Sequence, residues 1–167
     1  MNPQPDHRKQ VSIESDIWDA LDRIPGTDRR EALELIYQWA HSSEGLVVLS
    51  RPSARVAVSA VLGALKSESS KGPARVYIAD TRRQQLTFLF GELSKINLAS
   101  EVTLYHGSLT QFFRDLSMSA DLICMDSGAP DLGAVGALRS ALSPCAVILS
   151  LNTSSGEAER IEGPRSI

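Results

Sequence analysis

The chain has 167 residues, of which 43% are hydrophobic and 22% charged, so it is long enough for one globular domain with a substantial core. Its formal net charge of −3 argues against a nucleic-acid partner. No apolar run reaches the ~18 residues that a membrane span needs, and the polar N-terminus has no signal-peptide pattern, so we expect a cytoplasmic protein. Cys124 and Cys145 both lie in apolar runs, which favours buried thiols over a disulfide or a metal pair.

The N-terminal part of the chain predicts a tail followed by two helices. Residues 1–10 are mostly polar and contain two prolines, which is typical of a disordered tail. Residues 11–43 carry apolar side chains at helical spacing, and the sequence PGTD at 25–28 divides them into two amphipathic helices. We expect Trp18 and Trp39 to pack on the core beside these helices rather than to contact a ligand.

The hydrophobic pattern changes in residues 44–153, which we expect to form the core of the fold. Five short runs rich in Val, Ile and Leu predict strands at 46–50, 75–79, 101–105, 121–125 and 146–150. Helical patterns lie between them at 54–66, 82–97, 109–116 and 131–142. Alternating strands and helices indicate parallel strands joined by right-handed crossovers. The predicted fold is therefore α/β, a Rossmann-like open and mainly parallel sheet with helices on both faces, two extra N-terminal helices and a flexible tail at 154–167.

Ligands of such sheets bind beyond the carboxyl ends of the strands, so the residues that follow each strand are the candidates for function. The turn after the first strand begins at Ser50 and contains no glycine before Leu62, although nucleotide-binding turns are usually glycine-rich. Asp80 ends the second strand, where a carboxylate can hold the two hydroxyls of a ribose. The alternative is that Asp80 caps the next helix.

Three further strand ends carry polar side chains, each with two interpretations. Asp126 follows the fourth strand and either binds a metal or cationic group or caps the turn in DSGAP. His106 follows the third strand and is either a general base or, as we favour, a turn residue. Asn152 follows the fifth strand and is a metal ligand or a turn residue. Arg82 and Arg83 either meet a phosphate or, as we favour, form a solvated face.

The order of these pieces resembles the class I S-adenosylmethionine-dependent methyltransferases, and most of all the small cation-dependent O-methyltransferases of the catechol and caffeoyl-CoA type. The resemblance runs over residues 29–156 and rests on four stretches taken together, because no single motif is specific. These stretches are LVVLSRPSARVAVSAVLGAL (46–65), RVYIADTRRQQLTFLFGELSKINLASEVTLYHGSLTQFFRDL (75–116), ADLICMDSGAPDL (120–132) and AVILSLNTSSG (146–156).

The resemblance implies a cofactor, S-adenosylmethionine, and a set of residues to bind it. The implied cofactor-binding residues are Ser50, Ser53, Ala54, Asp80, Thr81, Ser108, Leu109 and Asp126. Within this set, Asp80 would hold the ribose, and Ser108 stands where the family usually has an acid near the adenine. Asp126 would lie near the methyl-transfer centre with His106 as a candidate base, and Asp126 and Asn152 would be metal ligands.

The sequence also departs from the family's pattern. Val48 stands where the first motif has an acid, and Ser50 and Ala54 stand at its glycine positions. Pro52 stiffens the turn and removes an N–H donor. Leu151 replaces an aspartate after the fifth strand, so only Asp126 and Asn152 remain as ligands for Mg²⁺, which needs several oxygens. We therefore expect added Mg²⁺ to have no effect on ligand binding.

The C-terminal segment of the sequence bears on how the fifth strand is covered. The residues after the fifth strand are too few for the further helix and antiparallel strand pair of the family, which predicts that this strand is an exposed edge or is covered by a second copy in a homodimer.

The first functional hypothesis is methyl transfer to the oxygen of a small-molecule acceptor. The second is a catalytically inactive relative that acts as a binding or assembly module. A nicotinamide-dependent oxidoreductase is third, because the first turn lacks G-x-G-x-x-G.

Overall fold

A computed structural model describes residues 13–67, 72, 74–126, 142–152 and 157–162. Its helices are α1 (Ser15–Asp22), α2 (Arg30–Ser42), α3 (Ala54–Leu65), α4 (Arg83–Lys95) and α5 (Leu109–Leu116), with a short 3₁₀ helix, η1, at Ala99–Glu101. Its strands are β1 (Leu46–Ser50), β2 (Arg75–Asp80), β3 (Val102–His106), β4 (Ala120–Asp126), β5 (Leu142–Asn152) and β6 (Glu157–Glu162). Among these residues no helix is both long and apolar enough to cross a bilayer.

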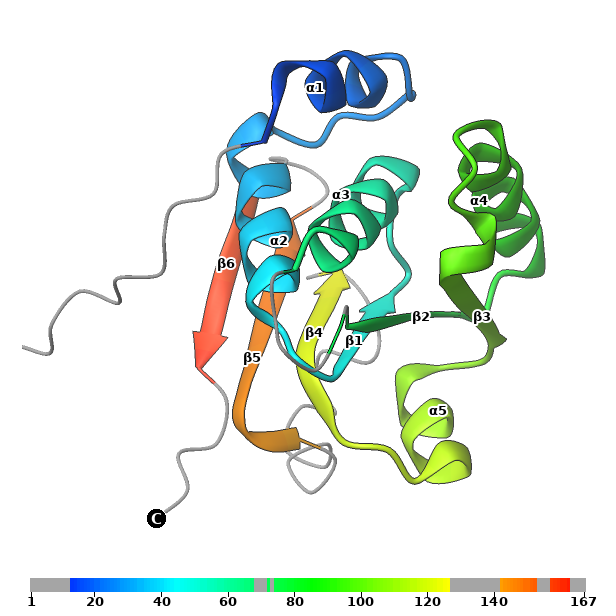
Figure 1. Ribbon diagram of the computed structural model, residues 1–167. Coiled ribbons are helices and arrows are strands. Elements are labelled where there is room, and N and C mark those ends of the chain that lie inside the picture. Colours follow the sequence, from blue (N-terminus) through cyan, green and yellow to red (C-terminus); the bar gives the residue numbers. More distant parts are fainter. Residues whose placement is uncertain (1–12, 68–71, 73, 127–141, 153–156, 163–167) are drawn as a thin grey trace, which may run out of the picture.

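The strands form one six-stranded sheet in the order β3-β2-β1-β4-β5-β6 (Figure 1). Strands β1 to β5 are parallel, and β6 runs antiparallel to β5. From β1 the chain moves outward through β2 to β3, and it then returns to the other side of β1 to add β4, β5 and β6. The direction of winding therefore reverses between β1 and β4, which makes this pair the topological switch point of an open α/β sheet. The predicted Rossmann-like fold is confirmed.

Helices cover both faces of the sheet because its central strands are apolar on both sides. All five residues of β1 are buried. Val47 and Leu49 belong to a large core shared with α1, α2, α3 and α4, whereas Val48 belongs to a smaller core shared with α5 on the other face (Figure 1). Trp18 and Trp39 pack against the large core as half-buried side chains, as the sequence predicts.

The C-terminal part of the sheet differs from the sequence-based expectation. Residues 157–162, expected within a flexible tail, form β6 and pair with β5 from Val147↔Glu162 to Asn152↔Glu157. The expectation that β5 is an exposed edge is therefore wrong for this chain. The segment EAERIE carries four charges in six residues and lacks the apolar run of an interior strand, but charged side chains suit an edge strand.

Other boundaries differ by a few residues. Strand β5 begins at Leu142, four residues before the predicted strand, and β4 extends the predicted strand at both ends. The sequence places Leu142 at the end of a helix over 131–142, and the rest of that predicted helix lies outside the described residues. The predicted tail at 1–10 lies outside them as well.

Candidate functional site

The parallel strands bring the predicted functional residues to one edge of the sheet. In the strand register Ser50 pairs with both Ala79 and Met125, so the ends of β1, β2 and β4 lie side by side. Asp80 pairs with His106 at the end of β3. The carboxyl edge on both sides of the switch point is therefore lined by residues that the sequence singled out.

Asp80 is fully buried, with no exposed side-chain surface, and Arg82 contacts both of its carboxylate oxygens. The backbone N–H of Arg82 donates to Oδ1 at 2.8 Å, its Nε donates to Oδ1 at 3.0 Å, and its Nη2 donates to Oδ2 at 2.9 Å. The Arg82 side chain remains 47% exposed above the carboxylate. The buried carboxylate of Asp80 thus forms a bidentate ion pair with the guanidinium, which is the geometry that stabilises a buried carboxylate.

This arrangement refines one sequence-based preference and leaves another open. The sequence favours a solvated face for Arg82, which is exposed, but its guanidinium also lies on Asp80. The residue at the N-cap position of α4 is Arg82, not Asp80, and it makes no side-chain cap. Helix capping therefore does not account for Asp80, and a ligand role for this carboxylate stays open.

The loop after β1 is built differently from a glycine-rich turn. Its residue with positive φ is Arg51, at 51°, whereas the sequence pointed to Ser50 and Ala54 as the glycine-like positions. The N–H of Arg51 donates to the carbonyl of Ala79 at 3.0 Å, which ties the loop to β2. Nε of Arg51 is buried and has no hydrogen-bond partner among the described residues. Ser50 and Ala54 are both buried.

The start of α3 is tied to the connection between α1 and α2. Ser53 is the N-cap of α3: its hydroxyl oxygen accepts from Val56 N–H at 3.2 Å, and its O–H group donates to Asp28 Oδ2 at 2.8 Å. Arg55 is 9% exposed, and its Nη1 donates to the carbonyls of Gly26 at 3.2 Å and Asp28 at 3.1 Å. The connection between α1 and α2 is therefore held against the start of α3, next to the loop that follows β1.

Ser108 and Leu109 have structural roles in this state. Ser108 and Gln111 form a capping box at the start of α5, in which Ser108 Oγ accepts from Gln111 N at 3.1 Å and Gln111 Oε1 accepts from Ser108 N at 2.8 Å. Leu109 is fully buried in the smaller core. His106 is exposed, and its Nε2 lies 3.1 Å from the carbonyl oxygen of Thr81, which is also exposed.

The predicted metal ligands lie at neighbouring strand ends. Asp126 is the last residue of β4 and pairs in register with Leu151, so Asn152 follows one residue later at the same edge. Their side chains lie outside the described part of the structure. Within the described part, no group of three or more His, Cys, Asp or Glu side chains is arranged to hold a metal ion.

Comparison with known proteins relates this geometry to one class of folds. No protein-family model matches the chain, and no curated protein matches its sequence. The solved structures that it matches include a cofactor-bound protein from MTB, with a TM-score of 0.61 and 14% sequence identity. That match covers 81% of this chain and 62% of the other chain. A methyltransferase from Geobacter sulfurreducens matches with a TM-score of 0.61 and 17% sequence identity, over 84% of this chain and 71% of the other. A protein provisionally named caffeoyl-CoA O-methyltransferase from Staphylococcus aureus matches with TM-score 0.59, 14% identity and coverage of 82% and 66%.

The chain has the class I methyltransferase fold. It spans between 62% and 71% of the length of these three proteins. At such low sequence identities the likeness shows the fold alone, because one fold can host many functions. The switch point, the loop after β1 and Asp80 lie at the carboxyl edge of the sheet, which is the edge where open α/β sheets bind ligands.

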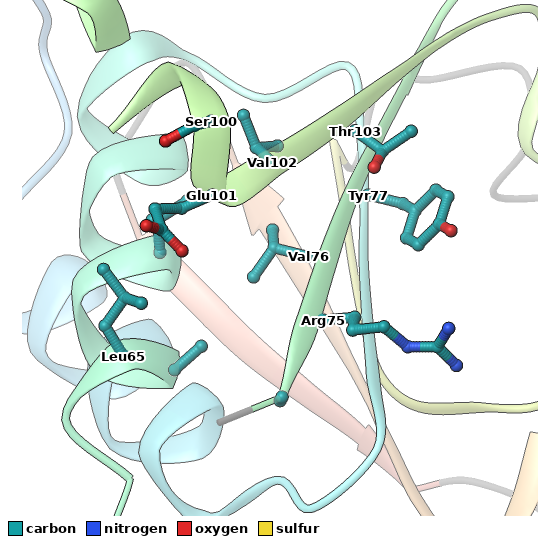
Figure 2. A pocket seen from close by; sticks show the side chains of 11 residues that line it. Leu65, Arg75, Val76, Tyr77, Ser100, Glu101, Val102 and Thr103 are labelled. Carbon is teal, nitrogen blue, oxygen red and sulfur yellow. The ribbon is translucent and has the colours of Figure 1, made fainter. Parts of the chain in front are cut away.

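A cavity of about 270 Å³ lies at the other end of the sheet, beside the amino ends of β2 and β3. Leu65, Val76 and Glu101 border it from α3, β2 and η1, while Arg75 and Tyr77 extend to the opposite side of β2 (Figure 2). None of the predicted site residues lines this cavity. It is therefore separate from the ligand crevice expected of a methyltransferase fold.

Proposed function

We propose that this chain binds S-adenosylmethionine at the carboxyl edge of its sheet and transfers the methyl group to an oxygen of a small-molecule acceptor. The observation that carries the proposal is the buried carboxylate of Asp80 at the end of β2, within a class I methyltransferase fold. A carboxylate at this position can accept hydrogen bonds from both hydroxyls of a ribose.

The described residues fit the ribose end of this cofactor better than its amino-acid end. Asp80 supplies two acceptor oxygens. Val48, which stands at the family's acid position, is buried in the smaller core and offers no charge to an ammonium group. Arg51 instead places a cation in the loop after β1, where a carboxylate of the ligand would find a charged partner.

The cofactor supplies an electrophilic methyl group on a sulfonium, and the protein's contribution is to hold the acceptor in line with it. Transfer of this methyl group to an acceptor hydroxyl would release the hydroxyl's proton to a base of the chain, with S-adenosylhomocysteine as the other product. We assign His106 as the candidate base and Asp126 as the residue nearest to the reacting groups. Asp126 and Asn152 remain the candidate metal ligands, and Mg²⁺ would lower the pKa of the acceptor hydroxyl if they bound it.

A second candidate function is a binding or assembly module without turnover. The pairing of Asp80 with Arg82 favours it, because the carboxylate is already satisfied within the chain. A homodimer belongs to this alternative, and light scattering of the purified protein tests it.

Calorimetric titration with S-adenosylhomocysteine, with and without Mg²⁺, tests the proposal. We expect micromolar binding that Mg²⁺ does not change, and a loss of about 1–3 kcal/mol in the variant Asp80→Asn, the scale of losing charged hydrogen bonds. Asp115→Asn is the matched control, because Asp115 lies on α5 and pairs with Tyr105.

Three results would redirect the assignment. No binding at millimolar ligand would favour the module without turnover. Unchanged affinity in Asp80→Asn would contradict the ribose assignment. Tighter binding of NAD⁺ than of S-adenosylhomocysteine would favour an oxidoreductase.

A further inference from the structure

The contact between Arg82 and Asp80 has the geometry of a ligand contact. The guanidinium spans both carboxylate oxygens, with Nε on Oδ1 and Nη2 on Oδ2. The two hydroxyls of a ribose would use the same two oxygens in the same way. The arginine and a ribose therefore compete for one acceptor group.

Exchange of one partner for the other leaves the buried carboxylate satisfied. Asp80 has no exposed surface, so its charge cannot lose its donors without a large desolvation cost. The backbone N–H of Arg82 also donates to Oδ1 and does not depend on where the side chain lies. Two O–H donors of a ribose would replace two N–H donors of the guanidinium, and the total number of hydrogen bonds to Asp80 would stay the same.

The position of Arg82 makes this exchange sterically simple. Its side chain is 47% exposed on the rim, whereas Asp80 lies beneath it. A ligand that approaches the edge of the sheet therefore meets the arginine first, and the displaced guanidinium moves toward water rather than into the core. The cost of displacement is modest because the guanidinium gains hydration, while the buried carboxylate keeps its backbone donor and gains the ribose hydroxyls.

We propose that Arg82 is the specificity-determining residue of the ribose subsite, an internal competitor that only a ligand with a vicinal diol displaces. This inference rests on the proposed function, because it takes Asp80 as the ribose acceptor. A ligand without the diol leaves Arg82 in place and gains nothing from Asp80. The apparent affinity for a nucleoside ligand equals the intrinsic affinity multiplied by the fraction of molecules in which Arg82 is displaced.

Calorimetric titration of S-adenosylhomocysteine into the variants Arg82→Ala and Arg83→Ala tests the proposal. Arg83 is the matched control, because it is an adjacent exposed arginine at the start of α4. We expect Arg82→Ala to bind about tenfold more tightly than the parent protein, as for a competent fraction of about one tenth. Arg83→Ala should bind as the parent protein does.

The salt dependence of the unaltered protein gives a second readout that needs no substitution. Salt screens the half-exposed guanidinium of this pair, although the buried carboxylate limits the effect, and the ribose hydroxyls carry no charge. Raising ionic strength should therefore increase modestly the affinity of the parent protein for S-adenosylhomocysteine. The variant Arg82→Ala should lack this increase. Arg82→Lys, which keeps the charge and loses the two-pronged geometry, should fall between the two proteins.

The outcomes separate this inference from the function on which it rests. If no protein binds S-adenosylhomocysteine, including Arg82→Ala, the proposed function fails and the inference fails with it. If all bind and Arg82→Ala is no tighter than the parent protein, the function stands and the inference is overturned. An equal gain in Arg83→Ala would also overturn it, because the effect would then be one of net charge. If Arg82→Ala does not fold, the salt dependence of the parent protein decides.

Discussion

Arg51 holds the loop after β1 in a conformation that normally belongs to glycine. Its φ of 51° lies in the left-handed region, which costs an L-residue roughly 1–2 kcal/mol. Its Nε is also buried without a partner among the described residues. Strain of this kind gathers at functional sites, and here it lies at the switch point of the sheet.

We predict that Arg51→Gly raises the free energy of unfolding by about 0.5–1 kcal/mol, because the relief of the left-handed penalty exceeds the extra chain entropy of glycine. Urea denaturation measures the change. Arg51→Ala is the control, since it removes the same charge and buried Nε but keeps a Cβ. Equal stabilities for the two variants would show that the backbone conformation is not the cause.

At the residue scale the sequence predicts where a side chain lies in the fold better than it predicts which residues the side chain contacts. Asp80 is correctly placed at a strand end, because strand ends follow from periodicity. Its pairing with Arg82 could not be predicted, since it depends on a side-chain rotamer. The left-handed Arg51 carries no sequence signal either. The capping role of Ser108 does have one, the pattern S-x-x-Q that ends at Gln111.

At the scale of elements, α2 and α3 pack closely because of one glycine. A Cβ on Gly63 would lie 2.4 Å from the carbonyl oxygen of Tyr37 on α2, too close for any real contact. This position therefore sets how closely α3 approaches α2.

We predict that Gly63→Ala destabilises the protein by about 1–3 kcal/mol, because the added methyl group must push two helix backbones apart. Gly91→Ala is the matched control within α4. Apart from the backbone of its own helix turn, a methyl group at Gly91 would have no atom within 4 Å, so alanine should stabilise the helix by about 0.5–1 kcal/mol. Thermal denaturation of both variants measures the contrast, and destabilisation by both would point to backbone conformation rather than to packing.

Most elements could be predicted from hydrophobic periodicity, and the exceptions have physical reasons. Pro144 lies within β5, and because a proline normally argues against a strand, periodicity alone does not predict the first part of β5. It does not predict β6 either, because the charged segment EAERIE has the composition of solvated polypeptide. Its pairing comes from β5, which supplies a complete row of partners from Val147 to Asn152.

At the scale of the whole molecule, the sheet joins distant segments into one core. Strand β4 shows this most clearly, because its residue Cys124 pairs in register with Leu49 on β1 and with Leu149 on β5. The Cys124 side chain is buried as a free thiol in the large core, as the sequence predicts. Its ionisation therefore reports on the integrity of the whole sheet rather than on one element.

Burial raises the pKa of the Cys124 thiol from 9.0 to about 12. The folded state thus disfavours the thiolate. The contribution of this thiol to the free energy of unfolding is fully present below pH 9 and is lost as the pH rises through about 12. We predict that the free energy of unfolding falls between these values in the parent protein and falls less in Cys124→Ala. Urea denaturation across this range measures the difference, because tyrosine and lysine ionisation is common to both proteins. Parallel pH profiles would show that the thiol does not ionise on unfolding. A steeper fall in the parent protein would show that opening the sheet exposes Cys124 to water.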